Sequence, residues 1–357
     1  MAETRRTRLI LGKPNREYLA KVVYRQLGAK RRQVIVGPRF GVDNAVVRIG
    51  PTQVLVATAD PLSFIPALGA AASAWLSVNL LASDLTTSGF APQYGIFDFN
   101  LPPAMSQALF TNYWKHFHNE CRKLGLAIIG GHTGRYQGCG YTVIGGGTMC
   151  AIGTEDEYLT SGMAQAGDDI ILTKGAAIET TAVMARVFPI KIEKAIGSEL
   201  FEKARAYLYK VSTVMDALTA VSLGVHEDGV TAMHDATEGG VIAAVFELAQ
   251  ASRLGAEVLL SEIPVATETR EICRLFHIDP LTSLSEGSLV ITCKPERTEK
   301  LLGKLRAAEI EASAVGRLMN RQRFWGLDSS GARQVIHYPR FDPYWKAYWK
   351  AVSKRWK

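Results

Sequence analysis

The sequence has little cysteine, and its cysteines are not spaced as metal sites or disulfide frameworks require. Only five occur among 357 residues, an odd number with no C-x-x-C pair. Large chains with such spacing usually keep their thiols reduced and partly buried. The pattern therefore excludes a disulfide scaffold and a structural zinc site. The cysteines are Cys121, Cys139, Cys150, Cys273 and Cys293.

Long apolar runs are missing as well. The longest candidate, residues 70–82, carries Ser73, Ser77 and Asn79 and falls short of the roughly 18 apolar residues that a membrane span needs. The N-terminus has no apolar core of a signal peptide. A hydrophobic content of 47% with a net charge of only +7 excludes an intrinsically disordered chain. We therefore expect a cytoplasmic protein with no membrane span and, from its length, two domains.

The positive charge is unevenly distributed. Much of the excess of 41 Lys and Arg over 34 Asp and Glu lies in residues 5–32 and 346–357, whereas the middle of the chain is nearly neutral. A basic chain of this kind raises the possibility of a nucleic-acid partner. Because the charge is concentrated at the two ends, we rank that interpretation third.

Short β-rich runs and helical runs alternate in both halves of the chain. We expect an α+β layered fold twice over, with each sheet covered on one face only, rather than one doubly wound parallel sheet. The predicted boundaries are 1–157, 165–333 and a C-terminal helix in 334–357, with a linker at 153–167. Strands are expected at 34–36, 45–49, 54–58, 94–99, 127–129, 141–152, 170–173, 231–234, 257–260, 288–293 and 313–318. Helices are expected at 70–88, 103–124, 176–187, 199–223, 239–252, 267–276 and 296–308.

Three carboxylates in the first half lie where strands or helices end: Asp43, Asp60 and Asp84. Acids placed this way can point into one cleft and hold a hard cation such as Mg²⁺. Taken singly, each is better explained as a turn or capping residue. Asn79 and Ser83 are four residues apart on the same helix as Asp84, so in so apolar a helix they need polar partners.

Two glycine-containing segments resemble anion-binding turns. Gly130, Gly131, His132 and Thr133 follow a strand and are predicted to form a turn with free N–H groups and donors for phosphate. The segment is neither GxxxxGK[ST] nor GxGxxG, so the common nucleotide fingerprints are absent. A plain turn explains it equally well.

The second of these segments, residues 235–240, joins a strand to a helix. Thr237 is expected to cap that helix and leave the N–H groups of Gly239 and Gly240 facing an anion. A simple capped helix start is the alternative, although it does not explain the paired glycines. Lys174, at the end of another strand, is a basic group suited to phosphate, or simply an exposed lysine.

Taken in order, these segments resemble the AIR synthase superfamily, which includes thiamine-monophosphate kinase and selenophosphate synthetase. They are most similar to the hydrogenase maturation factor HypE and the AIR synthase-related proteins. The resemblance covers about residues 12–320. The matching segments are 37–47, 58–61, 79–84, 130–133, 235–240 and the series 263–265, 279–281 and 285–289.

The resemblance implies a two-domain PurM-like fold in which the N-terminal sheets of two subunits pair into a barrel across a homodimer. It also implies an enzyme that uses ATP and Mg²⁺ to transfer phosphate to an oxygen acceptor of the amide or phosphate type, together with a maturation partner protein. The implied metal ligands are Asp43, Asp60, Asp84 and Asp235. Other residues along the nucleotide path are Asn79, Gly130, Gly131, Thr133, Lys174, Thr237, Gly239 and Gly240. The implied catalytic residues are Asp84, His132 and Glu286.

Some positions depart from the family pattern. Asn44 and Ser83 replace an acid and an amide, Gly134 replaces a charged residue, and no cysteine follows Cys293, whereas HypE carries its acceptor cysteine at the C-terminus. These departures keep two alternatives open. One is a non-catalytic nucleotide-binding scaffold or assembly partner, and the other is a small-molecule kinase like thiamine-monophosphate kinase.

The end of the chain has an amphipathic pattern of its own. Asp342 and Pro343 are a good helix start. The aromatic stripe after them is formed by Trp345, Tyr348, Trp349, Val352 and Trp356, opposite Lys346, Lys350, Lys354 and Lys357. We expect this helix to pack on the protein's own body, and binding to RNA or an anionic membrane surface is the alternative.

Overall fold

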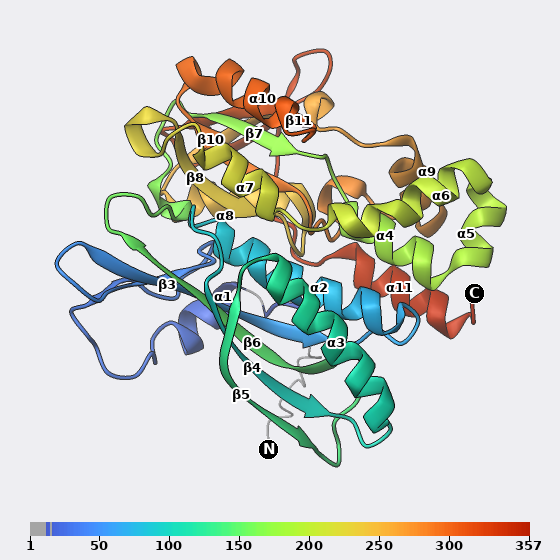
Figure 1. Ribbon diagram of the computed structural model, residues 1–357. Helices are drawn as coiled ribbons and strands as arrows, with labels where there is room; N and C mark the ends of the chain where they lie inside the picture. The colour runs from blue at the N-terminus through green and yellow to red at the C-terminus, as the bar shows by residue number, and fades with distance from the viewer. Residues whose placement is uncertain (1–11, 15) are drawn as a thin grey trace, which may run out of the picture.

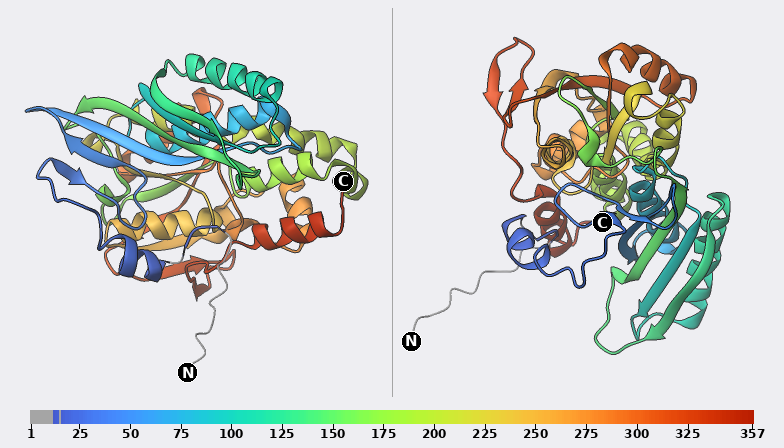
Figure 2. Two further views of the ribbon diagram at one scale, coloured as in Figure 1. Left: turned by 90° about the horizontal axis from the view of Figure 1, so that it is seen from below. Right: turned by 90° about the vertical axis from the view of Figure 1, so that its left-hand side faces the viewer.

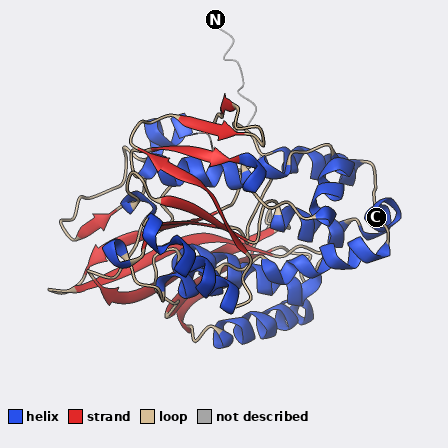
Figure 3. Ribbon diagram, turned by 90° about the horizontal axis from the view of Figure 1, so that it is seen from above, coloured by secondary structure: helices blue, strands red, loops and turns tan. Residues whose placement is uncertain are grey.

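Antiparallel pairing builds two separate sheets, one in each half of the chain. The computed structural model describes residues 12–14 and 16–357, and Figures 1 and 3 show the two sheets with helices packed against them. Both are predominantly antiparallel, so the predicted α+β class is confirmed. Within the described residues, no helix is long and apolar enough to cross a membrane.

The first sheet has six strands in the order β1-β2-β3-β6-β4-β5. All neighbours pair antiparallel except β4 and β5. Two helices cover one face (Figure 1): α2 (Gly69–Thr86) and α3 (Gln107–Lys123). The strands are β1 (Val34–Val36), β2 (Ala45–Arg48), β3 (Gln53–Ser63), β4 (Tyr94–Leu101), β5 (Ala127–Arg135) and β6 (Val143–Thr154).

Alternation along these strands separates a covered face from a bare one. On β4, Phe97 and Phe99 are buried against the helices, whereas Tyr94 and Ile96 are 37% and 47% exposed. Ile152 on β6 is also exposed. The prediction of one covered face is therefore confirmed for this sheet.

The second sheet has seven strands in the order β13-β12-β9-β11-β7-β10-β8. Only β12 and β9 pair parallel. The strands are β7 (Asp169–Thr173), β8 (Val230–Asp235), β9 (Gly255–Leu259), β10 (Leu289–Cys293), β11 (Ala312–Met319), β12 (Phe324–Leu327) and β13 (Arg333–Val335).

Both faces of this second sheet are covered, so the prediction of one covered face is wrong here. Every residue of β8 and β10 is buried. Alternate residues enter two different cores: Leu172 packs with α8 (Gly240–Ala251), whereas Ile171 packs with α7 (Val214–Val221) and α10 (Thr298–Ala307). Strands buried on both sides lose the alternation from which coverage was inferred.

The remaining helices form a lobe at one end of the second sheet. It contains α4 (Ile178–Val187), α5 (Pro189–Ile196), α6 (Ser198–Ala206), α9 (Thr267–Phe276) and α11 (Pro343–Ser353), which share one core. The short elements are α1 (Arg16–Tyr18), η1 (Leu19–Val23), η2 (Ser161–Met163), η3 (Tyr207–Lys210), η4 (His226–Asp228), η5 (Leu260–Glu262), η6 (Pro280–Thr282) and η7 (Pro295–Arg297).

One sequence expectation about connections needs correction. The helix expected at 199–223 is broken, because the carbonyl of Ser212 accepts from Lys174 Nζ and the N–H of Thr213 donates to Ser83 Oγ. These two backbone groups therefore do not form the hydrogen bonds that a continuous helix would need. The segment 153–167 follows the first sheet and precedes the second, and it is packed against both halves, because Tyr158 and Leu159 are buried in two different cores.

The apolar helix α2 lies between the two halves and contacts α7 and β8. Its buried serines satisfy backbone groups of other elements, as the sequence requires. Ser73 Oγ accepts from the N–H of Ile65, and Ser77 Oγ accepts from that of Ser63, both at 2.9 Å. Ser83 Oγ accepts from Thr213 N at 2.9 Å and joins the halves.

We predict that Ser83→Ala lowers the free energy of unfolding by about 1–3 kcal/mol, because it leaves the buried N–H of Thr213 without an acceptor. Urea unfolding followed by circular dichroism measures the loss. Ser222→Ala is the control, since that hydroxyl is at the surface, where it donates to the carbonyl of Thr219 in its own turn and accepts from Lys304 Nζ. Equal stability of the two variants would contradict the role given to Ser83.

Candidate active site

Four predicted acids meet where the two halves touch. Asp43 precedes β2, Asp60 lies on the covered face of β3, Asp84 is in the last turn of α2, and Asp235 ends β8. Burial and the charges of Asp235, Asp60 and Asp43 hold the pKa of Asp84 well above its usual value. The structure therefore brings the predicted metal ligands into one electrostatic cluster.

Two threonines tie the first of these acids to α2. Thr58 Oγ1 donates to the carbonyl of Asp43 at 3.0 Å and lies 3.5 Å from Asp84 Oδ2. Thr87 Oγ1 lies 3.4 Å from Asp43 Oδ2 and 2.8 Å from the carbonyl of Asp84. These contacts fix Asp43 beside the end of α2.

Several carboxylate oxygens of the cluster have no hydrogen-bond donor among the residues that the structure describes. Both carboxylate oxygens of Asp235 are buried with no hydrogen-bond partner, and so is Oε2 of Glu286. Burial, with the charge of Asp43, raises the pKa of Asp235 to about 7, and burial raises that of Asp60 to about 6. Orphaned carboxylate oxygens are the ligands that Mg²⁺ prefers, so these residues fit a divalent cation.

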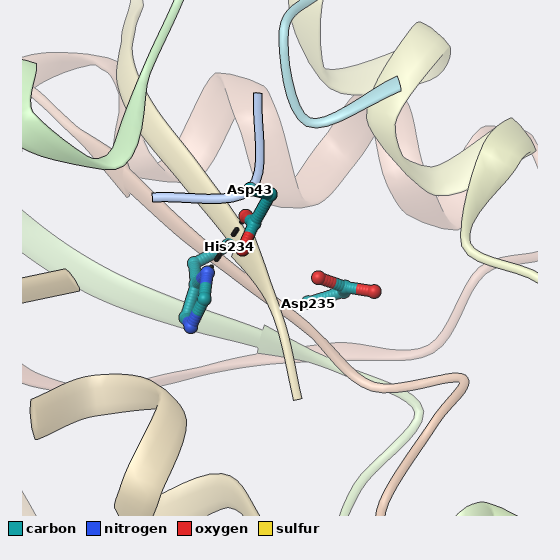
Figure 4. A group of neighbouring side chains, drawn as sticks. All are labelled: Asp43, His234 and Asp235. Atoms are coloured by element: carbon teal, nitrogen blue, oxygen red, sulfur yellow. Dashed lines mark hydrogen bonds and ion pairs between the residues drawn. The ribbon is translucent and has the colours of Figure 1, made fainter. Parts of the chain in front are cut away.

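His234 completes the cluster from β8, beside Asp235. Its Nδ1 lies 2.7 Å from Asp43 Oδ2 (Figure 4). Its Nε2 lies 2.9 Å from Glu247 Oε2. Burial opposes a charge on the ring, but the two carboxylates outweigh it and raise the pKa of His234 well above its usual value. Both nitrogens therefore donate. His234 acts as a cationic partner, although ligand atoms of Asp43, His234 and Asp235 lie within 4.8 Å of one another.

Lys13 is a second cation of the site that sequence reasoning missed. Its Nζ donates to Thr237 Oγ1 at 2.7 Å, and its backbone N–H donates to Glu238 Oε2 at 2.6 Å. Burial lowers its pKa, but Glu247, Asp84, Asp235 and Asp43 together raise it above the usual value. The sequence showed only a basic N-terminal stretch, and nothing in it placed one lysine against acids more than 200 residues away.

The turn before α8 differs from the prediction. Thr237 does not cap the helix, because its hydroxyl accepts from Lys13. Gly239 occupies the cap position in a left-handed conformation with φ of 82°, and its N–H donates to Asp342 Oδ2 at 2.8 Å. Gly240 also has a positive φ, and a Cβ there would meet the carbonyl oxygen of Leu281 at 2.6 Å. Tight packing therefore explains this second glycine.

The predicted glycine turn at residues 130–135 is wrong. These residues continue β5, which pairs in parallel with β4 as far as Arg135. His132 is exposed and its Nε2 bonds to Tyr136 Oη at 2.7 Å. Because β5 is an edge strand three positions from β3, it lies about 14 Å from Asp60. The structure does not bring Gly130, Gly131, His132 or Thr133 to the acids within one chain.

Two other predicted residues, Lys174 and Asn79, are used structurally, and so is Asn44, which departs from the family pattern. The side chain of Lys174 is 11% exposed, and its Nζ lies 3.0 Å from Asp216. Asn79 donates to the carbonyl of Trp75 in its own helix. Asn44 donates to the carbonyl of Asp84 at 2.8 Å, so its amide ties the loop to α2.

Two glutamates face the cluster from the second half. Burial, with the charges of Asp235 and Glu179, holds the pKa of Glu286 well above its usual value. Glu179, near the start of α4, was not predicted. Burial raises its pKa to about 8, and its Oε2 has no partner. Glu179 is therefore protonated over part of the physiological pH range and able to donate a hydrogen bond.

A cavity of about 1150 Å³ opens beside the cluster. It lies between the N-terminal turn of helix and the C-terminal segment, which run close together (Figure 2). Asp43 and His234 lie on its wall. Its aromatic walls include Phe40, Tyr338 and Phe341, and its cations include Lys13, Arg16, Arg39 and Arg340.

The sequence matches two family models in order. Residues 41–152 match "AIR synthase related protein, N-terminal domain", and residues 165–325 match "AIR synthase related protein, C-terminal domain". The chain therefore belongs to the AIR synthase related protein family, as its motifs predicted.

Curated relatives include enzymes of two kinds. Selenide, water dikinase of Methanococcus maripaludis is 27% identical over 63% of this chain and 68% of its own length. Carbamoyl dehydratase HypE of Escherichia coli is 26% identical over 75% of this chain and 76% of its own.

Solved structures share the fold. The HypE–HypF complex contains a chain with a TM-score of 0.71 at 17% identity, covering 90% of this chain and 99% of that one. HypE in complex with ATP gives a TM-score of 0.62 at 18% identity, covering 92% and 97%. These likenesses confirm the two-domain PurM-like fold.

We predict that the ligand-free protein loses stability as the pH rises from about 4 to 7. Asp60 and Asp235 ionise near 3.8 when unfolded but near 6 and 7 when folded, so the unfolded chain binds fewer protons across this range. Millimolar Mg²⁺ should reverse the loss, because it binds the ionised carboxylates. Melting temperatures measured against pH, with and without Mg²⁺, test both effects.

The matched variant for that experiment is Asp235→Asn. The substitution removes one of the acids whose pKa is raised. The ligand-free melting temperature of the variant should therefore fall less as the pH rises, and Mg²⁺ should raise it less than in the unmodified protein. A melting temperature that rises with pH in the unmodified protein would contradict the cluster as described.

Proposed function

We propose that this protein is an ATP- and Mg²⁺-dependent enzyme that transfers phosphate from ATP to an oxygen acceptor of the amide or phosphate type. The observation that carries the proposal is the carboxylate cluster with its orphaned Asp235 oxygens, placed beside a nucleotide-sized cavity. The names of the relatives, a dikinase and a dehydratase whose fold has been solved with ATP, support the same chemistry.

Phosphoryl transfer depends mainly on position and charge. The aromatic walls of the cavity would hold the base, and Arg16 and Arg39 on its wall would face the phosphates. Asp43, Asp60, Asp84 and Asp235 would hold Mg²⁺, which supplies neutralisation of the phosphate charge when bound. Lys13, among the same acids, adds a fixed positive charge at the cluster.

The acceptor would lie beside Glu286 and Glu179, which approach the acids from the second half and have raised pKa values. Glu179, with a pKa of about 8, is able to donate a hydrogen bond to the acceptor group. His132 stays a prediction, because it would reach a site only across a subunit contact.

A scaffold without catalysis is the second candidate. The orientation of Asn44 favours it, because an amide that binds α2 stands where the family pattern has an acid. A kinase resembling thiamine-monophosphate kinase remains the alternative for a small acceptor. A cytoplasmic location and a maturation partner stay part of the proposal.

We expect calorimetry to show binding of ADP with Mg²⁺, and we expect Asp84→Asn to lower ATP turnover by about 10²-fold or more, because the variant loses one charge at the metal site. Its melting temperature should not fall. Asp156→Asn, at an exposed position, is the control. Absence of nucleotide binding would contradict the proposed enzymatic function and leave only the shared fold. Nucleotide binding without turnover would favour the non-catalytic scaffold.

We also propose a homodimer that covers the bare face of the first sheet. Tyr94, Ile96 and Ile152 expose apolar side chains on this face, and such a surface favours association. The dimer would bury β5 as well, with its exposed His132.

Ile96→Lys should convert the dimer to a monomer, because it places a charge in the apolar contact. Sedimentation velocity at micromolar concentration measures this. Ile190→Lys is the control, since Ile190 is 65% exposed on α5, away from the sheet. A monomeric unmodified protein would contradict the proposed dimer.

A further inference from the structure

The C-terminal segment, residues 334–357, is part of the site as well as a packed helix. Trp345, Tyr348 and Trp356 of its aromatic stripe pack against the core of the helical lobe, as expected, whereas Trp349, Val352 and the lysines are exposed. Three of its side chains also bond to α8 or to the turn before it. Tyr338 Oη donates to Glu247 Oε1 at 2.6 Å, Asp342 accepts from Gly239, and Trp345 Nε1 donates to Glu238 Oε1 at 3.1 Å.

The hydrogen bond from Tyr338 is the first in a chain of hydrogen bonds that leads to Asp43, a proposed metal ligand. Glu247 accepts a hydrogen bond from Tyr338 on Oε1 and one from His234 on Oε2, so both of its carboxylate oxygens are held in place. His234 in turn holds Asp43 at 2.7 Å. The side chains of His234, Glu247 and Asp43 are only 3%, 8% and 10% exposed, so bulk water competes little for these bonds.

The ring of Tyr338 has its own support. Its centroid lies 5.5 Å from that of Phe40 and 6.0 Å from that of Phe246, both edge-on. Loss of the hydroxyl alone therefore leaves the ring in place. The hydrogen bond to Glu247 is separable from the packing of the segment.

We propose that Tyr338 is a positioning residue for the cation site, which acts through Glu247 and His234 to orient Asp43. This inference rests on the proposed function, because it takes Asp43 as a ligand of the cation. Groups that orient metal ligands by hydrogen bonds typically change metal affinity 10–100-fold. Because Tyr338 acts through two intervening residues, we expect the lower end of that range.

The test is Mn²⁺ binding to the full chain in the presence of ADP, measured from the electron paramagnetic resonance signal of free Mn²⁺. Tyr338→Phe should weaken Mn²⁺ binding about tenfold. Tyr348→Phe is the matched control in the same segment, because its hydroxyl has no hydrogen-bond partner among the residues that the structure describes. It should bind Mn²⁺ as the unmodified protein does.

A double-mutant cycle makes the route explicit. If Tyr338 acts through Glu247, adding Tyr338→Phe to Glu247→Gln should weaken Mn²⁺ binding less than Tyr338→Phe does alone. Unchanged affinity in Tyr338→Phe, equal losses in the two tyrosine variants, or fully additive losses would each overturn the inference. Failure of the unmodified protein to bind Mn²⁺ or ADP would instead overturn the proposed function, and the inference with it.

Discussion

Buried negative charge at the junction of the two halves is the constraint on which the rest of this structure depends. Asp43, Asp60, Asp84, Asp235 and Glu286 lie within electrostatic range of one another, and such a group is tolerated only with protons or cations. Lys13 and His234 supply part of that compensation. The ligand-free site therefore favours the binding of protons or of further cations.

The sequence predicted the acids of this cluster and much of the fold around them. Asp43, Asp60 and Asp84 left only a weak local signal at the ends of strands and helices, and the resemblance to AIR synthase proteins joined them to Asp235 as implied metal ligands. The sequence also predicted α2, whose buried serines met the partners that an apolar helix requires.

The failures have one physical origin, since they depend on contacts between distant segments. Lys13, Glu247 and Tyr338 are ordinary residues in their local sequence, and only the folded chain places them around His234. Residues 130–135 have the composition of a turn, yet pairing with β4 keeps them extended. The strands of the second sheet were predicted to have one buried face, because the local pattern of apolar residues does not show whether a second layer of helices covers the other face.

The site draws on the beginning, middle and end of the described chain, and this has a consequence for biosynthesis. The backbone of Lys13 bonds to Glu238, 225 residues away, and Tyr338 closes the same group of side chains. Contacts of such long sequence separation form late and slowly. A nascent or truncated chain able to fold its first sheet would still lack the complete site, so ligand binding would serve as a test that the whole polypeptide has been made and correctly folded.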